Sequence, residues 1–270
     1  MCPWPQHAVT YARMIRGDHA RRMLCMHAER LAQTATDATL PNPAATTLAQ
    51  ADTLGRFLEE LSGQFAPHPG SLPRTTLPEA PPRNSSEEAL DEEQLLLATA
   101  TAHPAELKDM RWLMPEDFTL PLHAALWQCL TSLVHRGDPV DPVTVLWEAQ
   151  HRSLLADGIA PSHLMSLIST PVGSPEYWGE KVVQRALLDR AHAVATRITT
   201  YTEDPANTPH QLITGSRRAL VGLTALRTRW QRATATATTP STATRIPRAP
   251  AIPRAGPPPR TAPPAARTLR

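Results

Sequence analysis

Residues that could bind a nucleotide phosphate are scarce in this sequence. Of its 27 basic residues only Lys108 and Lys181 are lysines, and both lie in segments with a helical pattern. A P-loop needs Gly-x4-Gly-Lys-Ser/Thr, because backbone N–H groups cradle the phosphates and the lysine reaches the terminal ones. No glycine loop precedes either lysine, and there is no Rossmann Gly-x-Gly-x-x-Gly. We therefore expect no ATP hydrolysis, no catalytic residue and no cofactor.

Metal-ligating and nucleophilic residues are also poorly arranged. His19, Cys25 and His27 are close in sequence, but Cys25 and His27 are two residues apart and so point to different sides of a helix. The sequence has no Cys-x2-Cys, no His-Glu-x2-His and no Gly-x-Ser-x-Gly. Cys129 lies in a segment of mixed apolar character, which favours a thiol in the core over a reactive one. No metal site is expected.

A group of acids allows two interpretations. It could be a carboxylate cluster, or the solvated first turns of a helix, where anionic side chains interact favourably with the helix dipole. The second interpretation is favoured, because the acids directly follow a capping pattern of Ser85 with Glu88. The acids are Glu87, Glu88, Asp91, Glu92 and Glu93.

Arginines at the end of the chain form the remaining candidate site. After Asp204 there are eleven arginines and no acid. Arginines spaced along an extended segment suit phosphate contacts that release counterions, but compositional bias explains them equally well. No aromatic residue alternates with them, so any DNA binding should be weak, non-specific and sensitive to salt. The candidate contacts are Arg245, Arg248, Arg254 and Arg260.

The totals indicate a protein that is only partly globular. The sequence has 29 prolines, concentrated in residues 67–82 and 240–264, and 4% aromatic residues. Three widely spaced cysteines do not suggest a disulfide framework and fit a reducing cytoplasm. There is no signal peptide and no apolar run of eighteen residues, so we expect a cytoplasmic protein that does not enter a membrane.

Apolar periodicity predicts an all-α fold divided into four segments. Residues 1–65 hold two helices, 7–36 and 44–65, and residues 66–84 form a Pro-rich linker, disordered or extended. Residues 85–232 form a small orthogonal helical bundle followed by a long αα-hairpin. Within this bundle we expect helices over 90–102, 104–115, 121–135 (ended by Gly137), from Asp141-Pro142 onward, and from a Ser162 cap. Residues 233–270 are an Arg/Pro-rich tail, expected to be disordered.

The hairpin, residues 174–232, carries apolar stripes longer than a small bundle can cover. Its helices are expected over about 174–201 and 209–230. The stripes could pack only on each other, or could also form the seam of a dimer, and the second interpretation is favoured. The residues assigned to the hairpin and its seam are Val183, Leu187, Val194, Ile198, Leu220, Leu223 and Leu226.

The order of motifs over about residues 87–230 resembles the N-terminal domain of DnaB-type replicative DNA helicases. No single motif is diagnostic, but the order and spacing are fairly specific. The motifs are Glu93-Gln-Leu-Leu-Leu97 before His103-Pro104, Met114-Pro-Glu-Asp-Phe118, Leu120-Pro121-x-His123, Leu126-Trp127, Arg136-Gly-Asp-Pro-Val-Asp141, Val143-Thr-Val145, Ser174-x-x-Tyr177-Trp178, Val182-Val183 and Leu187-x-x-Arg190.

The resemblance implies a non-catalytic interaction module linked to DNA replication. Hairpins of this family form dimers, so self-association is expected, with a replicative helicase, primase or helicase loader as partner. Phe118, His123, Trp127 and Asp141 would then fix the globular part, His123 as a core or capping histidine. The sequence departs from the family in lacking the ATPase motor, in the turn Asp157-Gly-Ile-Ala-Pro161 and in the added helical pair at the start. Two alternatives stay open: a regulatory nucleic-acid-binding protein acting through its arginines, and a subunit of a helicase whose ATPase is on another chain.

Overall fold

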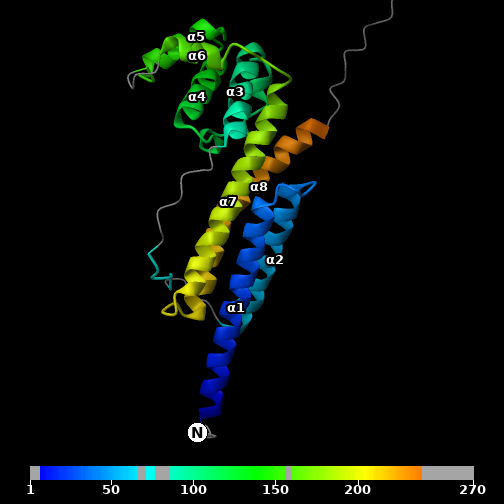
Figure 1. The fold of residues 1–270 in the computed structure, drawn as a ribbon, viewed down its shortest axis with the longest axis vertical. Coiled ribbons are helices and arrows are strands. Elements are labelled where there is room, and N and C mark those ends of the chain that lie inside the picture. The colour runs from blue at the N-terminus through cyan, green and yellow to red at the C-terminus, as the bar shows by residue number, and fades with distance from the viewer. Residues whose placement is uncertain (1–6, 66–70, 77–85, 156–159, 239–270) are drawn as a thin grey trace, which may run out of the picture. The chain divides into compact units, whose positions relative to one another are not determined.

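The computed structural model describes residues 7–65, 71–76, 86–155 and 160–238. Every regular element in this described part is helical, which confirms the predicted all-α fold (Figure 1). The 3-10 turns η2 (Glu106–Lys108) and η3 (Pro115–Asp117) lie between α3 and α4. The α-helices are α1 (Ala8–Thr36), α2 (Pro43–Gln64), α3 (Glu87–Ala102), α4 (Pro121–Arg136), α5 (Pro142–His151), α6 (Pro161–Leu167), α7 (Pro175–Glu203) and α8 (Pro209–Thr238).

Helix ends lie where the sequence supplies caps. The side chains of Asn42, Asp141 and Ser174 accept hydrogen bonds from first-turn N–H groups of α2, α5 and α7. Proline follows each of these caps at the start of the helix, where its missing N–H is not needed. Gly137 ends α4 as predicted, with a left-handed φ of 77° that glycine adopts without steric cost.

Two predictions about the start of the bundle are wrong in detail. The cap of α3 is Ser86, whose hydroxyl accepts from the N–H of Ala89, whereas the predicted Ser85 lies outside the described residues. The helix expected between Pro104 and Pro115 is reduced to the single turn η2. Instead of only ending a helix, Pro115 begins the next turn, η3, because its fixed φ suits a first helical position.

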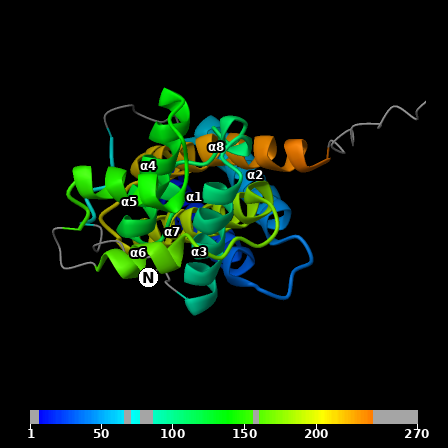
Figure 2. The same cartoon turned by 90° about the horizontal axis from the view of Figure 1, so that it is seen from above.

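Helices α3 to α6 form a small bundle with an aromatic centre. Trp127 of α4 is buried with its ring centroid 5.8 Å from that of Phe118. Leucines from α3, α4 and α6 surround this pair and belong to the same apolar cluster. The start of α6 differs from prediction, since its N-cap is Ala160 and Ser162 lies within the first turn. Figure 2 shows α4, α5 and α6 on one side of α7, away from the end of α8.

A buried carboxylate holds this bundle to α7. Glu93 has no exposed surface, and its carboxylate accepts from the N–H of Thr119 at 2.7 Å and pairs with Nδ1 of His123 at 2.8 Å. Arg185 of α7 reaches the same carboxylate at 3.3 Å and also pairs with Glu92. One side chain therefore joins α3, the loop before α4, α4 and α7. His123 is a core histidine, as expected.

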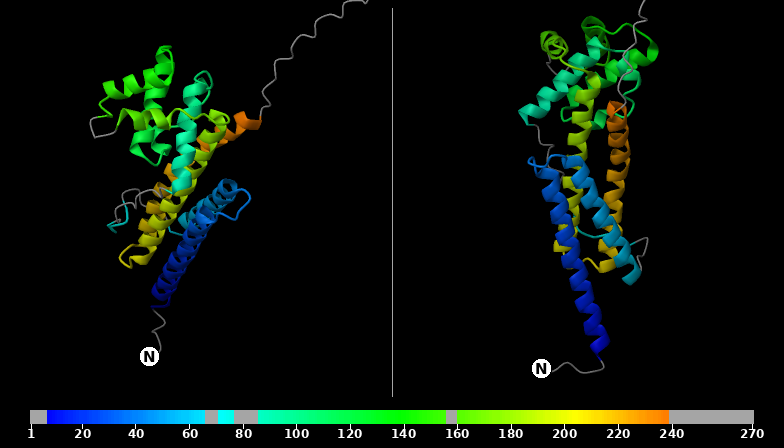
Figure 3. Two further views of the ribbon diagram at one scale, coloured as in Figure 1. Left: turned by 45° about the horizontal axis from the view of Figure 1, so that its top comes forward. Right: turned by 90° about the vertical axis from the view of Figure 1, so that its right-hand side faces the viewer.

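Helices α1, α2, α7 and α8 pack together as two antiparallel pairs. Figure 1 and Figure 3 show α1 and α2 side by side along the half of α7 nearer its C-terminus. Their buried leucines, except Leu61, belong to the same continuous core as those of α3, α4 and α7. The predicted domain boundaries on either side of residues 66–84 stay a prediction, but the helices before and after that segment share one core.

Arg21 clamps α1 onto the turn between α7 and α8. Its guanidinium donates to the backbone carbonyls of Thr202 at 2.9 Å and Asp204 at 2.6 Å, and to those of Pro205 and Asn207. These carbonyls lie at the C-terminal end of α7, where the last turn lacks intrahelical partners and carries partial negative charge. A cation from α1 thus caps a helix far away in the sequence.

Residues 71–76 bind the same turn as an extended strap. The N–H of Arg74 donates to the side-chain oxygen of Asn207 at 3.2 Å, and the hydroxyl of Thr75 donates to Asp204 at 2.6 Å. Pro73 lies so close to Gly215 of α8 that a Cβ there would come within 2.4 Å of the proline ring. The absence of a side chain at Gly215 therefore allows the strap to lie directly on α8.

Replacing Glu93 by Gln should lower the free energy of unfolding by about 3 kcal/mol, because an amide cannot accept from all three donors and leaves buried charge unpaired. The matched control is Glu87→Gln, on the exposed first turn of α3, which should cost less than about 0.5 kcal/mol. Urea unfolding followed by circular dichroism measures both. Equal midpoints for the two variants would contradict the structural role of Glu93.

Replacing Arg21 by Met should lower the free energy of unfolding by about 2 kcal/mol, since charged hydrogen bonds to the end of α7 are lost. Its neighbour Arg22 is the control, because its side chain is 70% exposed and pairs only with Asp18 within α1. Arg22→Met should change stability by less than about 0.5 kcal/mol. The same urea titration measures the free energy of unfolding of both variants. Comparable losses of stability in the two would exclude the proposed role of Arg21 in holding α1 on the α7–α8 turn.

Candidate protein-interaction site

The residues predicted for a dimer seam lie inside a single chain. Six of them are buried and Leu220 is half-buried. All seven belong to, or pack against, the core that α1 and α2 share with the hairpin. The fold therefore brings these residues together but leaves them little open surface. A dimer through them stays a prediction, and it requires α1 and α2 to leave this face. The seven are Val183, Leu187, Val194, Ile198, Leu220, Leu223 and Leu226.

The arginines predicted to contact nucleic acid fall outside the described residues. Arg245, Arg248, Arg254 and Arg260 all belong to residues 239–270. Their interpretation as phosphate contacts stays a prediction.

An exposed apolar face on α5 is the clearest surface for a partner protein. Val143 is 67% exposed and Trp147 63% exposed, one helical turn apart on the same face. The next residue on that face, His151, stacks on Trp147 with ring centroids 5.6 Å apart and an interplanar angle of 1°. Tryptophan is enriched among the residues that dominate binding energy at protein interfaces. We call Val143, Trp147 and His151 the α5 face.

A buried carboxylate, Glu148, attaches α5 to α4, on the side of α5 opposite this face. Glu148 is buried on the inner side of α5 and accepts from Arg136 of α4 at 2.8 Å and from Arg152 at 2.8 Å. The hydrogen bond from Arg136 is the main cause that lowers the pKa of Glu148, so its carboxylate is charged at neutral pH. Asp141 fixes the start of α5 through N–H groups of its first turn. These contacts fix the start of α5 and join its inner side to α4, which leaves the α5 face open.

The sequence contains a signal for the α5 face that the sequence analysis above did not use. The apolar stripe of this helix is Val145, Leu146 and Ala149, and the first and last of these are buried. Val143 and Trp147 are out of phase with that stripe. A tryptophan on the wrong side of an amphipathic helix is the pattern that indicates an exposed aromatic residue.

A second group of exposed apolar side chains lies at the start of α1. In Figure 1 and Figure 3 the first turns of α1 extend past the α7–α8 turn. Val9, Met14 and Ile15 are each more than 60% exposed there. Among the described residues this group contains no tryptophan, so the α5 face is the stronger candidate.

The two described cysteines and the acid Glu93, all named in the sequence analysis, are part of the packed structure and not of a reactive site. Cys129 is buried, as expected, and burial raises the pKa of its thiol to about 11, which makes it unreactive. Cys25 lies beside Glu29 within α1, and burial raises its thiol pKa as well. The interpretation of the acids at 87–93 as a solvated face is wrong for Glu93, which is fully buried. Periodicity could not show this, because the partners of Glu93 come from α4 and α7.

The described residues hold neither a cluster of metal ligands nor a membrane-spanning helix. No three of their His, Cys, Asp or Glu side chains are grouped as metal ligands. None of the helices in the described ranges combines the length and the apolar character needed to cross a bilayer.

The bundle that carries the α5 face is similar in sequence to a known protein domain. Residues 85–179 match the DnaB-like helicase N terminal domain. This confirms the resemblance predicted from the motif order for α3 to α6 and the first turn of α7. The matched segment ends at Gly179, so most of the hairpin lies beyond it.

Two curated relatives are replicative helicases. The chain is 34% identical over 87 residues to the replicative DNA helicase DnaB of Mycobacterium leprae (strain TN), covering 32% of this chain and 14% of that protein. It is 31% identical over 121 residues to the replicative DNA helicase DnaC of Bacillus subtilis (strain 168), covering 44% of this chain and 26% of that protein. The aligned part is thus a minor share of each relative. No solved structure matches.

The contact of α1 with α2 should weaken in mild acid. His27 of α1 stacks on Phe57 of α2 with ring centroids 4.7 Å apart. Burial, and then the charge of Arg30, lowers the pKa of His27 below its ordinary value of 6.5, although Glu60 acts in the opposite direction. Because the unfolded chain binds the proton more tightly, this contribution to stability is lost as pH falls below about 6.5.

The variant His27→Leu should therefore gain stability relative to the parent chain as pH is lowered from about 7.5 to about 5. Thermal unfolding of both proteins across this range measures the difference. A difference that stays constant with pH would contradict the assignment.

Proposed function

We propose that this chain is a non-catalytic interaction module of DNA replication that docks a partner protein through the α5 face. The match of residues 85–179 to a domain of replicative helicases supports the link to replication. The observation that carries the docking role is Trp147, an exposed tryptophan inside the matched segment, on a helix that the pair of Glu148 with Arg136 joins to α4. The partner is a replicative helicase, a primase or a helicase loader.

The chemistry of the α5 face defines what the partner must present. A flat stack of indole on imidazole beside Val143 needs an apolar pocket or groove that removes the indole from water. Arg152 and His151 lie at the end of α5, so an acidic rim on the partner would complement them. The face is already formed in the free chain, so docking requires little ordering.

The missing phosphate-binding motif and the pairing of the buried carboxylates support the non-catalytic part of the proposal. The sequence contains no Gly-x4-Gly-Lys-Ser/Thr, and both lysines lie in helices of the structure, Lys108 in η2 and Lys181 in α7. The buried carboxylates Glu93, Asp117 and Glu148 are each paired with an arginine or a histidine. These groups hold elements together and offer no free acid or base in a cleft.

Trp147→Ala should weaken binding of the true partner roughly 30-fold, because truncating an aromatic hot spot costs about 2 kcal/mol. Purified helicase, primase and loader from the same organism are each titrated against the immobilised full chain. Val221→Ala on α8 is the control, since Val221 is a comparably exposed residue at 69% but lies outside the matched segment. It should leave the affinity unchanged.

The proposal fails if none of the three proteins binds, or if binding is insensitive to Trp147→Ala. Because Trp147 is largely exposed, the variant should keep the helical content and unfolding midpoint of the parent chain. That check separates loss of docking from loss of fold.

A further inference from the structure

An open groove of about 360 Å³ lies between α2 and α8. Its apolar lining consists of Leu48 and Ala51 of α2 and Leu220 and Leu223 of α8. Leu220 is half-buried and the other three are buried core residues, so the core itself forms the floor of the groove. A volume of this size falls within the range of small-molecule sites in proteins. We call this feature the α2–α8 groove.

Two ion pairs flank the middle of the α2–α8 groove. Arg227 of α8 pairs with Asp52 of α2, with one N···O distance of 2.9 Å, and Arg217 of α8 pairs with Glu59 of α2 at 2.5 Å. Gly55 lies between the two acids along α2, about one turn from each and on the same side of the helix. A Cβ at Gly55 would meet no neighbouring heavy atom within 4 Å. The missing side chain at this position therefore keeps the middle of the groove open.

The charges around the α2–α8 groove leave one cation uncompensated. Arg56 also lines the groove, where its guanidinium donates to the hydroxyl of Thr53 at 3.2 Å and forms no ion pair with a described residue. Arg56 and the two ion pairs together place three arginines against two acids. An excess positive charge beside an apolar floor complements a ligand that carries one negative charge and an apolar body.

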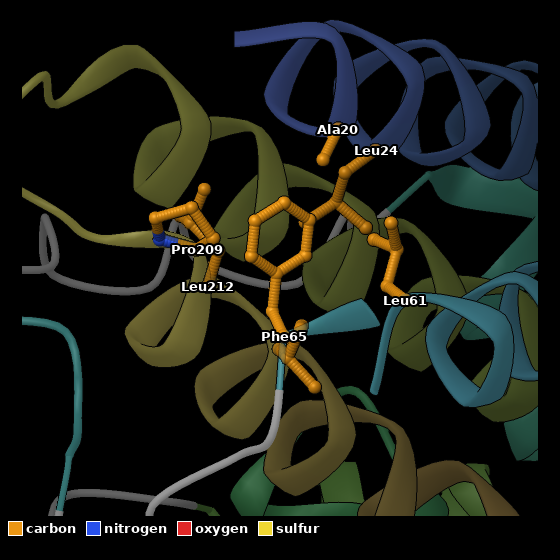
Figure 4. A pocket seen from close by; sticks show the side chains of 7 residues that line it. Ala20, Leu24, Leu61, Phe65, Pro209 and Leu212 are labelled. Atoms are coloured by element: carbon orange, nitrogen blue, oxygen red, sulfur yellow. The ribbon is translucent and has the colours of Figure 1, made fainter. Parts of the chain in front are cut away.

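A second gap, where the start of α8 meets α1 and the end of α2, is closed. Figure 4 shows the ring of Phe65 between Pro209 of α8 and Leu24 of α1, with Leu61 beside it. The gap that these side chains line leaves no room for a water molecule. All of its lining residues are apolar, so no charged group there would select a ligand. The α2–α8 groove is therefore the stronger candidate for a binding site.

We propose that the α2–α8 groove binds a small organic anion with an apolar body. The body displaces water from Leu48, Ala51 and Leu223, and the anionic group pairs with Arg56. Because the ligand touches both helices, binding stabilises the contact of α2 with α8. The groove lies outside the matched residues 85–179, and binding in it does not depend on the docking function of the α5 face.

A fluorescent probe and two glycine variants test the site. The probe is 8-anilinonaphthalene-1-sulfonate, which has apolar rings and one sulfonate and fluoresces on apolar surface. It is titrated into the full-length parent chain, Gly55→Leu and Gly63→Leu. Gly55→Leu puts a side chain into the groove, whereas Gly63 lies on the same helix with equally open space around a Cβ but does not line the groove. Leucine favours a helix over glycine, so both variants should keep the parent's circular dichroism.

The parent chain should bind the probe at a single site. Gly55→Leu should weaken this binding roughly tenfold, because the apolar floor is then covered by the chain itself, and Gly63→Leu should leave the affinity unchanged. A parent chain that does not bind the probe would overturn the proposal. Equal affinities in the two glycine variants would overturn it as well, since the probe would then lie elsewhere.

Competition for the probe tests the charge of the ligand. Octanoate, octan-1-ol and octylammonium share one apolar tail and differ in the charge of the head group. Octanoate should displace the probe at a roughly threefold lower concentration than octan-1-ol, and Arg56→Gln should remove this difference. Arg56 is exposed, so this comparison holds even if Gly55→Leu disturbs the fold. Equal displacement by all three compounds, or a preference for octylammonium, would overturn the proposal and indicate an unselective or cation-binding surface.

Discussion

The fold depends on covering the apolar stripe of α7 along its whole length. A helix of 29 residues is about 43 Å long, more than a small bundle can bury. Its N-terminal half lies against α3 and the loop before α4, where Gly179 allows Met110 and Trp112 to approach closely. Its C-terminal half lies between α1 and α8. Two groups of helices, one before and one after residues 66–85, thus become parts of one core because they share this helix.

Buried charges fix the directions of the elements around that stripe. Glu93 joins three helices, Glu148 fixes α5 on α4, and Asp117 pairs with Arg229 of α8 while it accepts from the N–H of Met114. Desolvation raises the pKa of Asp117 although Arg229 opposes the shift, so the pair holds a carboxylate in a costly environment. Such pairs tolerate few alternative arrangements, which explains why the described helices present defined outer faces.

The scaffold has one open apolar face and one covered apolar face. The α5 face belongs to the segment that matches the DnaB-like domain and is open in the free chain. The α7–α8 face lies mostly beyond that segment and is covered by α1 and α2.

The sequence by itself determined most of the helices, the end of α4, the start of α5 and the resemblance of the central segment to the DnaB-like domain. Helical periodicity, Asp141-Pro142 and Gly137 act over a few residues, so the bounds of α4 and α5 were predictable from local chemistry. Motif order was enough for the DnaB-like domain, because it reflects the order of the elements. Only the tertiary structure decided what covers the hairpin and where Glu93 lies. Those features depend on partners more than twenty residues away, such as Arg21 at the end of α7, and side-chain spacing along the chain carries no information about such contacts.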